Sequence, residues 1–217
     1  MKASCVSIIG IMAFFLSACV TGDEITSYVI NPDESISFSI YRLNLTSDET
    51  GEKAKNELAV YIQDLEEKRG DLFTKLMKGN AQEVQVTILR KASPATVLVT
   101  GRIPSLNDFA AYLSTEDKDN SIVCTPTSSE RARRLLCELT RKPSTEKAQL
   151  EIDTPPAYPS GEIRLTLAEG IFTNAQGFLL SNNKRSAILD EDALWKMRNP
   201  QTTSITLSLE WQIPEAP

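Results

Sequence analysis

The sequence predicts an α+β fold in which a mostly antiparallel sheet is packed by one long amphipathic helix and followed by a strand-rich C-terminal part. Several segments alternate apolar and polar residues, which is the pattern of a half-buried strand. One long segment, at about 48–78, instead has apolar residues at steps of three and four, as an amphipathic helix does. Short turns separate the expected strands, which favours antiparallel pairing.

The chain begins with the features of an export signal. Lys2 precedes an apolar run from Val6 to Leu16, which is too short to span a bilayer stably and has the layout of a secretory signal peptide. The run ends in Leu16-Ser17-Ala18-Cys19, which resembles the lipobox of bacterial lipoproteins. The resemblance implies cleavage before Cys19, a diacylglyceryl thioether on its sulfur and an acylated amino terminus.

The same resemblance implies a location. In Gram-negative lipoproteins an aspartate after the lipidated cysteine retains the protein in the inner membrane, whereas this chain has Val20. For a Gram-negative source, which the single basic residue of the signal favours, we therefore expect the periplasmic face of the outer membrane. A Gram-positive source would remove this argument. Residues 19–31 are expected to be the lipidated cysteine and a short polar tether that holds the body close to the membrane.

The first strand and the long helix follow the tether. The strand is expected over about 36–45, where isoleucine and phenylalanine alternate with serine. The helix is expected over about 48–78. Thr46-Ser47-Asp48-Glu49 has the form of a capping box at its start, Gly79-Asn80 suits its end, and Gly70 can kink it. We assign 32–143 to an α+β domain on this basis.

A hairpin and a short helix come next. The hairpin strands are expected near 84–88 and 95–100, with Pro94 in the turn. The helix is expected to begin at Ser105 and to end near Leu113.

Residues 144–217 are assigned to a strand-rich C-terminal part. Whether this part is a separate sandwich-like unit or completes the same sheet is left open. Its expected elements are strands near 148–153, 163–167, 171–173 and 205–213, and a short helix near 190–197.

Two cysteines remain once the export segment is set aside. Cys5 leaves with residues 1–18 and Cys19 carries lipid, so Cys124 and Cys137 are expected to form a disulfide in an oxidising compartment. An antiparallel pairing that sets these two cysteines opposite each other makes one face of the hairpin apolar, with Ile122 opposite Leu139 and Pro126 opposite Leu135. The alternative is two free, buried thiols.

The composition excludes some kinds of chemistry. Without residues 1–18 the chain has 199 residues, with 22 Lys and Arg against 29 Asp and Glu, a net charge of −7, which argues against a nucleic-acid partner. The chain has no histidine, so catalytic triads built on imidazole are excluded and the commonest metal ligand is missing. We expect no cofactor and no metal.

Three clusters are the candidate sites. Arg131, Arg133 and Arg134 form a basic group that would suit an anionic lipid headgroup or an acidic partner surface, or is a solvated turn. Acidic residues at 190–192 and 116–119 would supply paired carboxylates for hydrolysis, although the first set is also typical of the first turn of a helix.

These observations leave three functions open. The first is a lipoprotein with a non-catalytic structural, accessory or assembly role, which acts on an envelope protein partner. The second is a module that binds an envelope lipid or glycan, suggested by the basic group and by Tyr112, Tyr158 and Trp195. The third is a hydrolase that uses carboxylates alone. The absence of a recognisable catalytic motif favours the first, and we expect that the protein is not an enzyme.

Overall fold

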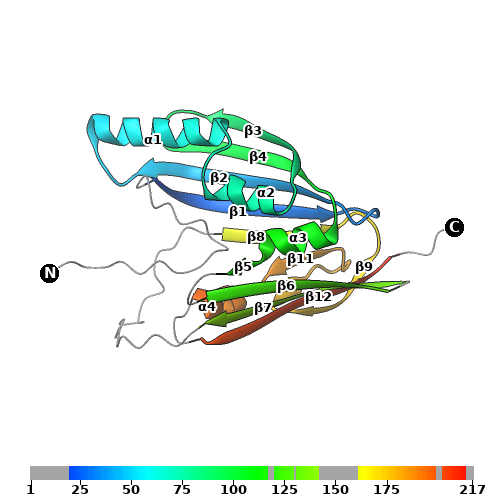
Figure 1. Cartoon of the computed structure of the whole chain (residues 1–217). Helices are drawn as coiled ribbons and strands as arrows, with labels where there is room; N and C mark the ends of the chain where they lie inside the picture. Colours follow the sequence, from blue (N-terminus) through cyan, green and yellow to red (C-terminus); the bar gives the residue numbers. More distant parts are fainter. Residues whose placement is uncertain (1–19, 117–119, 130, 142–160, 199–201, 214–217) are drawn as a thin grey trace.

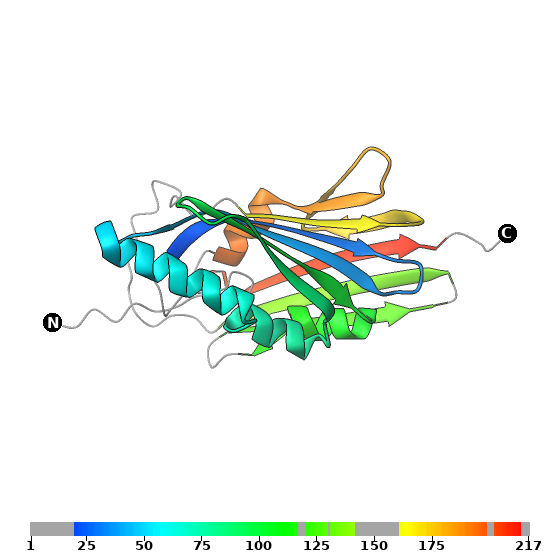
Figure 2. The same cartoon turned by 90° about the horizontal axis from the view of Figure 1, so that it is seen from above.

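The structure is a computed structural model that describes residues 20–116, 120–129, 131–141, 161–198 and 202–213. Its strands form two sheets, which Figure 1 shows as separate layers and Figure 2 shows from above. The larger sheet has seven strands in the order β10 (Phe178–Leu180), β11 (Ser186–Leu189), β8 (Gly161–Leu167), β1 (Val20–Ile30), β2 (Ile36–Ser47), β4 (Ala95–Ile103) and β3 (Gln82–Arg90).

The smaller sheet contains the disulfide hairpin and the last strand. Its five strands are β5 (Thr115–Glu116), β6 (Asn120–Ser128), β7 (Ala132–Arg141), β12 (Ser204–Gln212) and β9 (Ile171–Gln176), in that order. All of its pairings are antiparallel. Strands from after residue 160 occur in both sheets, so the described part of 144–217 shares its two layers with the residues before it.

The prediction of a tether over 19–31 is wrong for the residues that the structure describes, because Val20–Ile30 form β1, near the centre of the larger sheet. This strand pairs antiparallel with β2 and parallel with β8. Val20 itself is fully buried. At Gly22 the strand has an irregularity, and a Cβ there would lie 2.5 Å from the carbonyl oxygen of Leu43, so glycine is required for this close approach.

The helices are α1 (Gly51–Glu66), α2 (Asp71–Lys78), α3 (Leu106–Leu113) and α4 (Glu191–Arg198). The expected long helix is therefore divided, and Gly70 with φ 92° lies at the break, where a left-handed backbone favours glycine. The expected capping box is not formed: α1 begins after Thr50, without a side-chain cap. By contrast, α3 is capped as expected, since the Ser105 hydroxyl accepts a hydrogen bond from the Asp108 amide.

The first two helices and the smaller sheet cover the same face of the larger sheet, side by side. Arg42, on the inward face of β2, donates a hydrogen bond to the Tyr61 hydroxyl on α1. The same arginine also borders a cavity that the smaller sheet closes from the other side. Helix α3 joins the layers, because it contacts β4 in one sheet and β6 in the other (Figure 1).

The predicted α+β class, with one long helix as the main cover of a sheet, is wrong. Both halves of the described chain are rich in strands. The larger and the smaller sheet face each other over much of their apolar surfaces. Alternation along a strand shows that one face is buried but does not show whether a helix or a second sheet buries it. Helix α1 contacts β1, β2 and β3, and α2 packs against α3.

The strand positions themselves agree well with the sequence. Strands β2, β3, β4, β8, β9 and β12 and helix α4 include or overlap the expected segments. Strands β10 and β11 were not predicted. The strand expected near 148–153 lies outside the described residues.

Apolar side chains fill the space between the layers at the end of the molecule remote from Val20. Ile30 pairs with Leu167 across β1 and β8, and the rings of Phe172 and Trp211 meet edge to face with centroids 6.2 Å apart. All four residues are at most 3% exposed. This end of the interior is therefore closed and well packed.

Candidate functional site

A cavity lies between the two sheets, where Glu24, Thr26 and Tyr28 of β1 form part of its wall. Its volume is about 100 Å³, which corresponds to the share of liquid volume of roughly three water molecules. Its wall comes from both sheets and from α2 and α3, and most of the lining residues are apolar. These apolar residues are Leu72, Phe109, Leu113, Ile122, Cys124, Leu135, Cys137, Leu139, Ile163, Leu165, Phe178, Leu189, Leu207 and Leu209.

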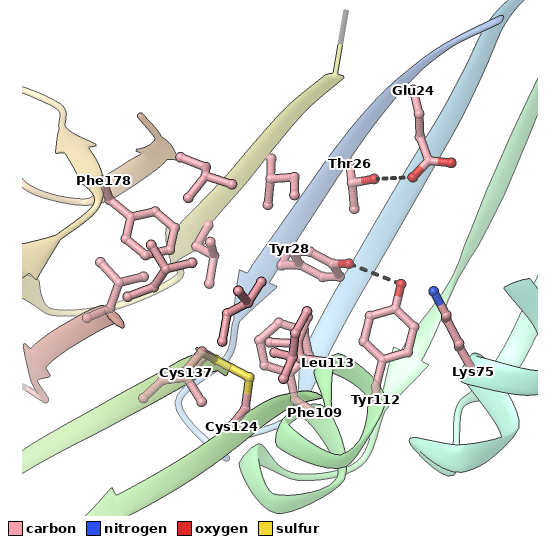
Figure 3. A pocket seen from close by; sticks show the side chains of 18 of the residues that line it. Glu24, Thr26, Tyr28, Lys75, Phe109, Tyr112, Leu113, Cys124, Cys137 and Phe178 are labelled. Atoms are coloured by element: carbon pink, nitrogen blue, oxygen red, sulfur yellow. Dashed lines mark hydrogen bonds between the residues drawn. A yellow bond between two sulfur atoms is a disulfide. The ribbon is translucent and has the colours of Figure 1, made fainter. Parts of the chain in front are cut away.

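The remaining lining residues are polar or carry a hydroxyl group, and they gather at one side. Figure 3 shows the polar groups of Glu24, Thr26, Tyr28, Lys75 and Tyr112 on one side of the cavity, whereas Phe178 lies on the other. The Glu24 side chain is 32% exposed, while Thr26 and Tyr28 are buried. Solvent therefore reaches the cavity wall on the polar side, at Glu24.

Glu24 is held by an ion pair on the inner face of the larger sheet. Its carboxylate accepts a hydrogen bond from the Arg42 Nε at 3.1 Å, and a second one from the Thr26 hydroxyl at 3.3 Å. Arg42 also donates to the Tyr61 hydroxyl. Because Arg42 is nearly fully buried, these hydrogen-bonded partners offset the cost of removing its charge from water.

The two tyrosines at the polar side form a hydrogen-bonded pair. The Tyr28 hydroxyl donates to the Tyr112 hydroxyl at 3.1 Å, and both rings pack edge to face, while Phe109 packs against each of them. Burial raises the pKa of Tyr112 to about 12 and raises the pKa of Tyr28 well above its ordinary value. Both phenols are therefore neutral hydrogen-bonding groups at physiological pH.

The disulfide belongs to the cavity wall. Cys124 and Cys137 are bonded across β6 and β7, and they are partners in the register of this hairpin, as predicted. The predicted apolar pairs, Ile122 with Leu139 and Pro126 with Leu135, are also confirmed. All of these residues except Pro126 line the cavity.

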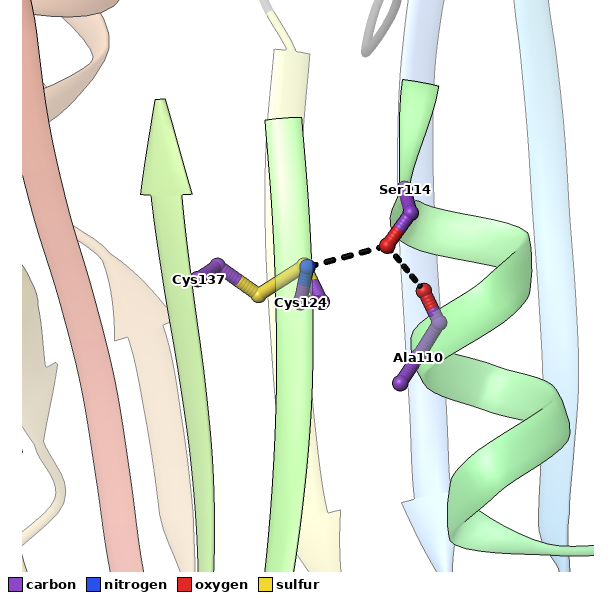
Figure 4. The surroundings of a disulfide bond; sticks show 4 residues. All are labelled: Ala110, Ser114, Cys124 and Cys137. Atoms are coloured by element: carbon purple, nitrogen blue, oxygen red, sulfur yellow. Dashed lines mark hydrogen bonds between the residues drawn. A yellow bond between two sulfur atoms is a disulfide. The ribbon is translucent and has the colours of Figure 1, made fainter. Parts of the chain in front are cut away.

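Ser114 connects the disulfide hairpin to α3. At the end of that helix, its hydroxyl donates to the Ala110 carbonyl at 2.7 Å and accepts from the Cys124 amide at 2.9 Å (Figure 4). The Cys124 amide thus finds its hydrogen-bond acceptor in the side chain of the residue that ends α3. This contact sets the position of Phe109 and Tyr112 relative to the smaller sheet.

The predicted basic group lies at the turn between β6 and β7 and at the start of β7, and none of its three residues lines the cavity. Arg133 forms an ion pair with Glu34 in the turn between β1 and β2, and Arg134 lies 3.3 Å from Glu210 on β12. Arg131 is exposed. An anion that bound to Arg133 or Arg134 would have to compete with a carboxylate of the protein itself.

The predicted acidic sites do not assemble into a catalytic pair among the described residues. Glu191 and Asp192 lie in the first turn of α4, and the Asp190 carboxylate accepts a hydrogen bond from the Asp192 amide at 3.3 Å, which is how a helix start is capped. Glu116 is in β5, and 117–119 lie outside the described residues. Within the described ranges no cluster of acidic residues or cysteines has the arrangement of a metal site.

The remaining sequence predictions have mixed outcomes. Tyr112, named as a possible ligand contact, does border the cavity, but Tyr158 and the side chain of Trp195 lie outside what the structure describes. Cys19 also lies outside the described residues. Sequence analysis missed Glu24, Arg42 and Lys75. Arg42 was detectable, because it continues the inward phase of Ile36, Phe38 and Ile40.

Comparisons with known proteins do not identify a family. No family model matches the chain, and no curated protein is similar to it in sequence. A solved structure that is similar in shape is the NMR structure of the folded domain of LppM from Mycobacterium tuberculosis. It has 10% sequence identity and a TM-score of 0.44, and the match covers 93% of this chain and 94% of that one. A likeness at this level does not carry over a function. Within the described residues, no helix has both the length and the apolar character needed to cross a bilayer.

Proposed function

We propose that this protein is a lipoprotein of the bacterial envelope, anchored through Cys19, that binds an apolar chain in the cavity between its two sheets and carries out no catalysis. For a Gram-negative source the location is the periplasmic face of the outer membrane. The observation that supports binding is the apolar cavity, whose polar groups converge on one side. An enclosed apolar site with a few convergent polar groups is the usual form of a small-molecule site.

The energetics of the cavity favour an occupant. Protein interiors are normally close-packed, as the remote end of this molecule is. An unfilled apolar cavity of about 100 Å³ destabilises a protein by about 2 kcal/mol, at roughly 24 cal/mol per Å³. A bound apolar group would recover this free energy, so the native protein is expected to be more stable with a ligand than without one.

The position of the cavity also suits a ligand taken from a membrane. Strand β1 begins at Val20, directly after the residue that we expect to carry lipid, and Glu24 is four residues further along the strand. At roughly 3.3 Å per residue, Glu24 on the polar side of the cavity lies only about 13 Å along β1 from Val20. The cavity would therefore lie near the bilayer surface.

The other functions have less support. The acidic residues at 190–192 have the structural role of a helix start, so a hydrolase that uses them is not proposed. The envelope protein partner expected from the sequence stays a prediction, and crosslinking of the lipidated protein in intact cells is the measurement for it.

Ligand binding is tested by calorimetric titration of 1-octanol into residues 20–217, which contain every described element. Leu165→Phe enlarges a buried side chain on the cavity wall. We expect this variant to bind 1-octanol at least tenfold more weakly than the natural sequence. The matched control is Leu98→Phe, the same substitution in β4 of the same sheet, at a half-buried position between the buried Val97 and Val99. No binding by the natural sequence, or equal weakening by both variants, would refute the proposal.

The anchor is tested separately with Cys19→Ala in the full chain. We expect membrane fractions to hold the natural protein as a processed lipoprotein, and the variant to stay unprocessed or to appear in the soluble fraction. Processing followed by stable membrane attachment of the variant would contradict lipidation at Cys19.

A further inference from the structure

The outer face of the larger sheet, opposite the cavity, has a group of apolar side chains near the start of β1. Glu24 on β1 and Arg42 on β2 line the cavity, so the alternation along these strands places their neighbours in sequence on the outer face. The residues of this group, which we call the outer patch, come from four adjacent strands. They are Ile25, Tyr41, Leu43, Leu89 and Leu98.

The strand register makes the outer patch continuous. Ile25 is the partner of Tyr41 across β1 and β2, and Tyr41 is the partner of Leu98 across β2 and β4. Residues directly opposite each other in an antiparallel pair have Cβ atoms about 5 Å apart, so these three side chains form a row. Leu43 lies two residues beyond Tyr41 and therefore on the same face.

The main layers that the structure describes lie on the other face of this sheet. Tyr61 of α1 meets Arg42 there, and α2, α3 and the smaller sheet enclose the cavity there. In the outer patch, by contrast, Tyr41 is 37% exposed and Leu89 is 54% exposed. Contiguous exposed apolar groups are typical of surfaces that meet a membrane or another molecule.

The outer patch lies at the end of the sheet that is joined to the expected anchor. The residue that we expect to carry lipid directly precedes Val20, the first residue of β1, so no tether separates the anchor from the sheet. Ile25 is five residues further along the strand, a distance of about 17 Å. An anchor this close holds the patch at a high effective concentration beside the bilayer, so even a weak contact would be populated.

The turn between β3 and β4 adds positive charge at the same end. Val20 pairs with Ser47, and Leu45 pairs with Ala95 at the start of β4, which places this turn near the start of β1. Arg90 and Lys91 are exposed there, and within the described ranges neither forms an ion pair. Basic side chains beside a bilayer are attracted to anionic headgroups.

We propose that the outer face of the larger sheet lies on the bilayer, with the row of Ile25, Tyr41 and Leu98 against the headgroup region and with Arg90 and Lys91 beside anionic headgroups. Tyrosine suits this place because it has an apolar ring and a polar hydroxyl. The inference rests on the anchor at Cys19, which is part of the proposed function, and goes beyond it by naming the face that meets the membrane.

The test places one fluorescent label on the lipidated full chain. Tyr41→Cys takes the label in the outer patch. Val123→Cys is the matched control, because Val123 is 46% exposed and lies between Ile122 and Cys124, which line the cavity, and so faces outward on the smaller sheet. Each variant is labelled with a nitrobenzoxadiazole maleimide and reconstituted into vesicles of phosphatidylethanolamine and phosphatidylglycerol. We expect a lipid with a nitroxide on its headgroup to quench the label at position 41 at least threefold more than the label at position 123.

A second pair of variants tests the role of the apolar side chains. Leu89→Asp in the chain labelled at position 41 replaces an exposed leucine of an edge strand, where the fold is expected to tolerate the change. It should reduce the quenching at least twofold. Val123→Asp, which makes the same kind of change on the smaller sheet, should leave the quenching unchanged.

The outcomes separate this inference from the proposed anchor. Equal quenching at the two positions, or quenching that Leu89→Asp does not reduce, overturns the contact while the anchor stands, provided that the protein floats with the vesicles. A label at position 41 that iodide cannot reach in residues 20–217 without lipid would mean that the chain itself or a second copy covers the patch, and this also overturns the contact. Failure of the protein to float with the vesicles contradicts the anchor itself and the contact with it.

Discussion

Removal of the disulfide should destabilise the protein by an amount that follows from its place in the chain. Cys124 and Cys137 are 13 residues apart, and the chain-entropy model gives about 3 kcal/mol for closing a loop of this length. The variant is Cys124→Ala/Cys137→Ala in residues 20–217. Alanine leaves no unsatisfied polar group on the cavity wall, so the loss is expected to come mainly from the unfolded chain.

The assay is urea unfolding followed by circular dichroism, with thermal unfolding as a second measurement. A chain of about 200 residues loses about 2–4 °C in Tm per kcal/mol, so a fall of roughly 6–12 °C is expected. A reducing agent should lower the stability of the natural sequence by a similar amount and leave the variant unchanged. The disulfide must first be shown to be formed in the natural sequence. A free energy of unfolding of the variant within 1 kcal/mol of that of the natural sequence would then refute the reasoning.

Three further predictions concern the surroundings of the cavity and the closed end. Ser114→Ala should cost about 1–3 kcal/mol, because the Cys124 amide loses its acceptor in a buried place; urea unfolding measures it, and a loss below 0.5 kcal/mol would contradict this role. Tyr112 holds its proton to a pKa of about 12 in the folded protein against 10.0 in the unfolded chain. Its contribution to stability is therefore present below pH 10 and falls by about 2 kcal/mol as the pH rises to 12. Unfolding measured at pH 9 and pH 11.5 should show a smaller fall for Tyr112→Phe, and an unchanged fall would refute this assignment. Arg133→Ala should cost about 1 kcal/mol through its ion pair with Glu34, and a double-mutant cycle with Glu34→Gln should show that the two losses are not additive.

The disulfide hairpin could be predicted in detail because its register is determined by local pattern. With one face buried, a shift of one residue would move every apolar side chain of the hairpin into water. The pairing of Cys124 with Cys137 is the register that keeps Ile122, Leu135 and Leu139 on one face. Strands β2 and β12 were predictable for the same reason.

Strand β1 could not be predicted because its partners are remote and its composition is misleading. Gly22, Asp23 and Glu24 are residue types that are depleted in strands. Their strand forms because β2 and β8 pair with it on both sides, and β8 comes more than 130 residues later in the chain. Long-range pairing of this kind overrides local propensity.

The cavity was not predictable because periodicity does not report how closely two layers approach. The apolar residues that line it have the same pattern as those that fill the closed end around Phe172 and Trp211. Only the polar residues left a trace in the sequence, since Glu24 and Arg42 occupy inward positions of their strands. A charged residue at a strand position where the alternating pattern would place an apolar one is the feature that indicates this site.

The most direct test of chain binding is the affinity of residues 20–217 for a series of unbranched 1-alkanols from butanol to dodecanol. Burial of each methylene in the cavity contributes about 0.8 kcal/mol, which is about a fourfold rise in affinity per carbon. We predict this rise for the shorter alcohols, a plateau once the chain fills the cavity, and a plateau at a shorter chain in Leu165→Phe. An affinity that does not depend on chain length would contradict an apolar chain in the space between the two sheets.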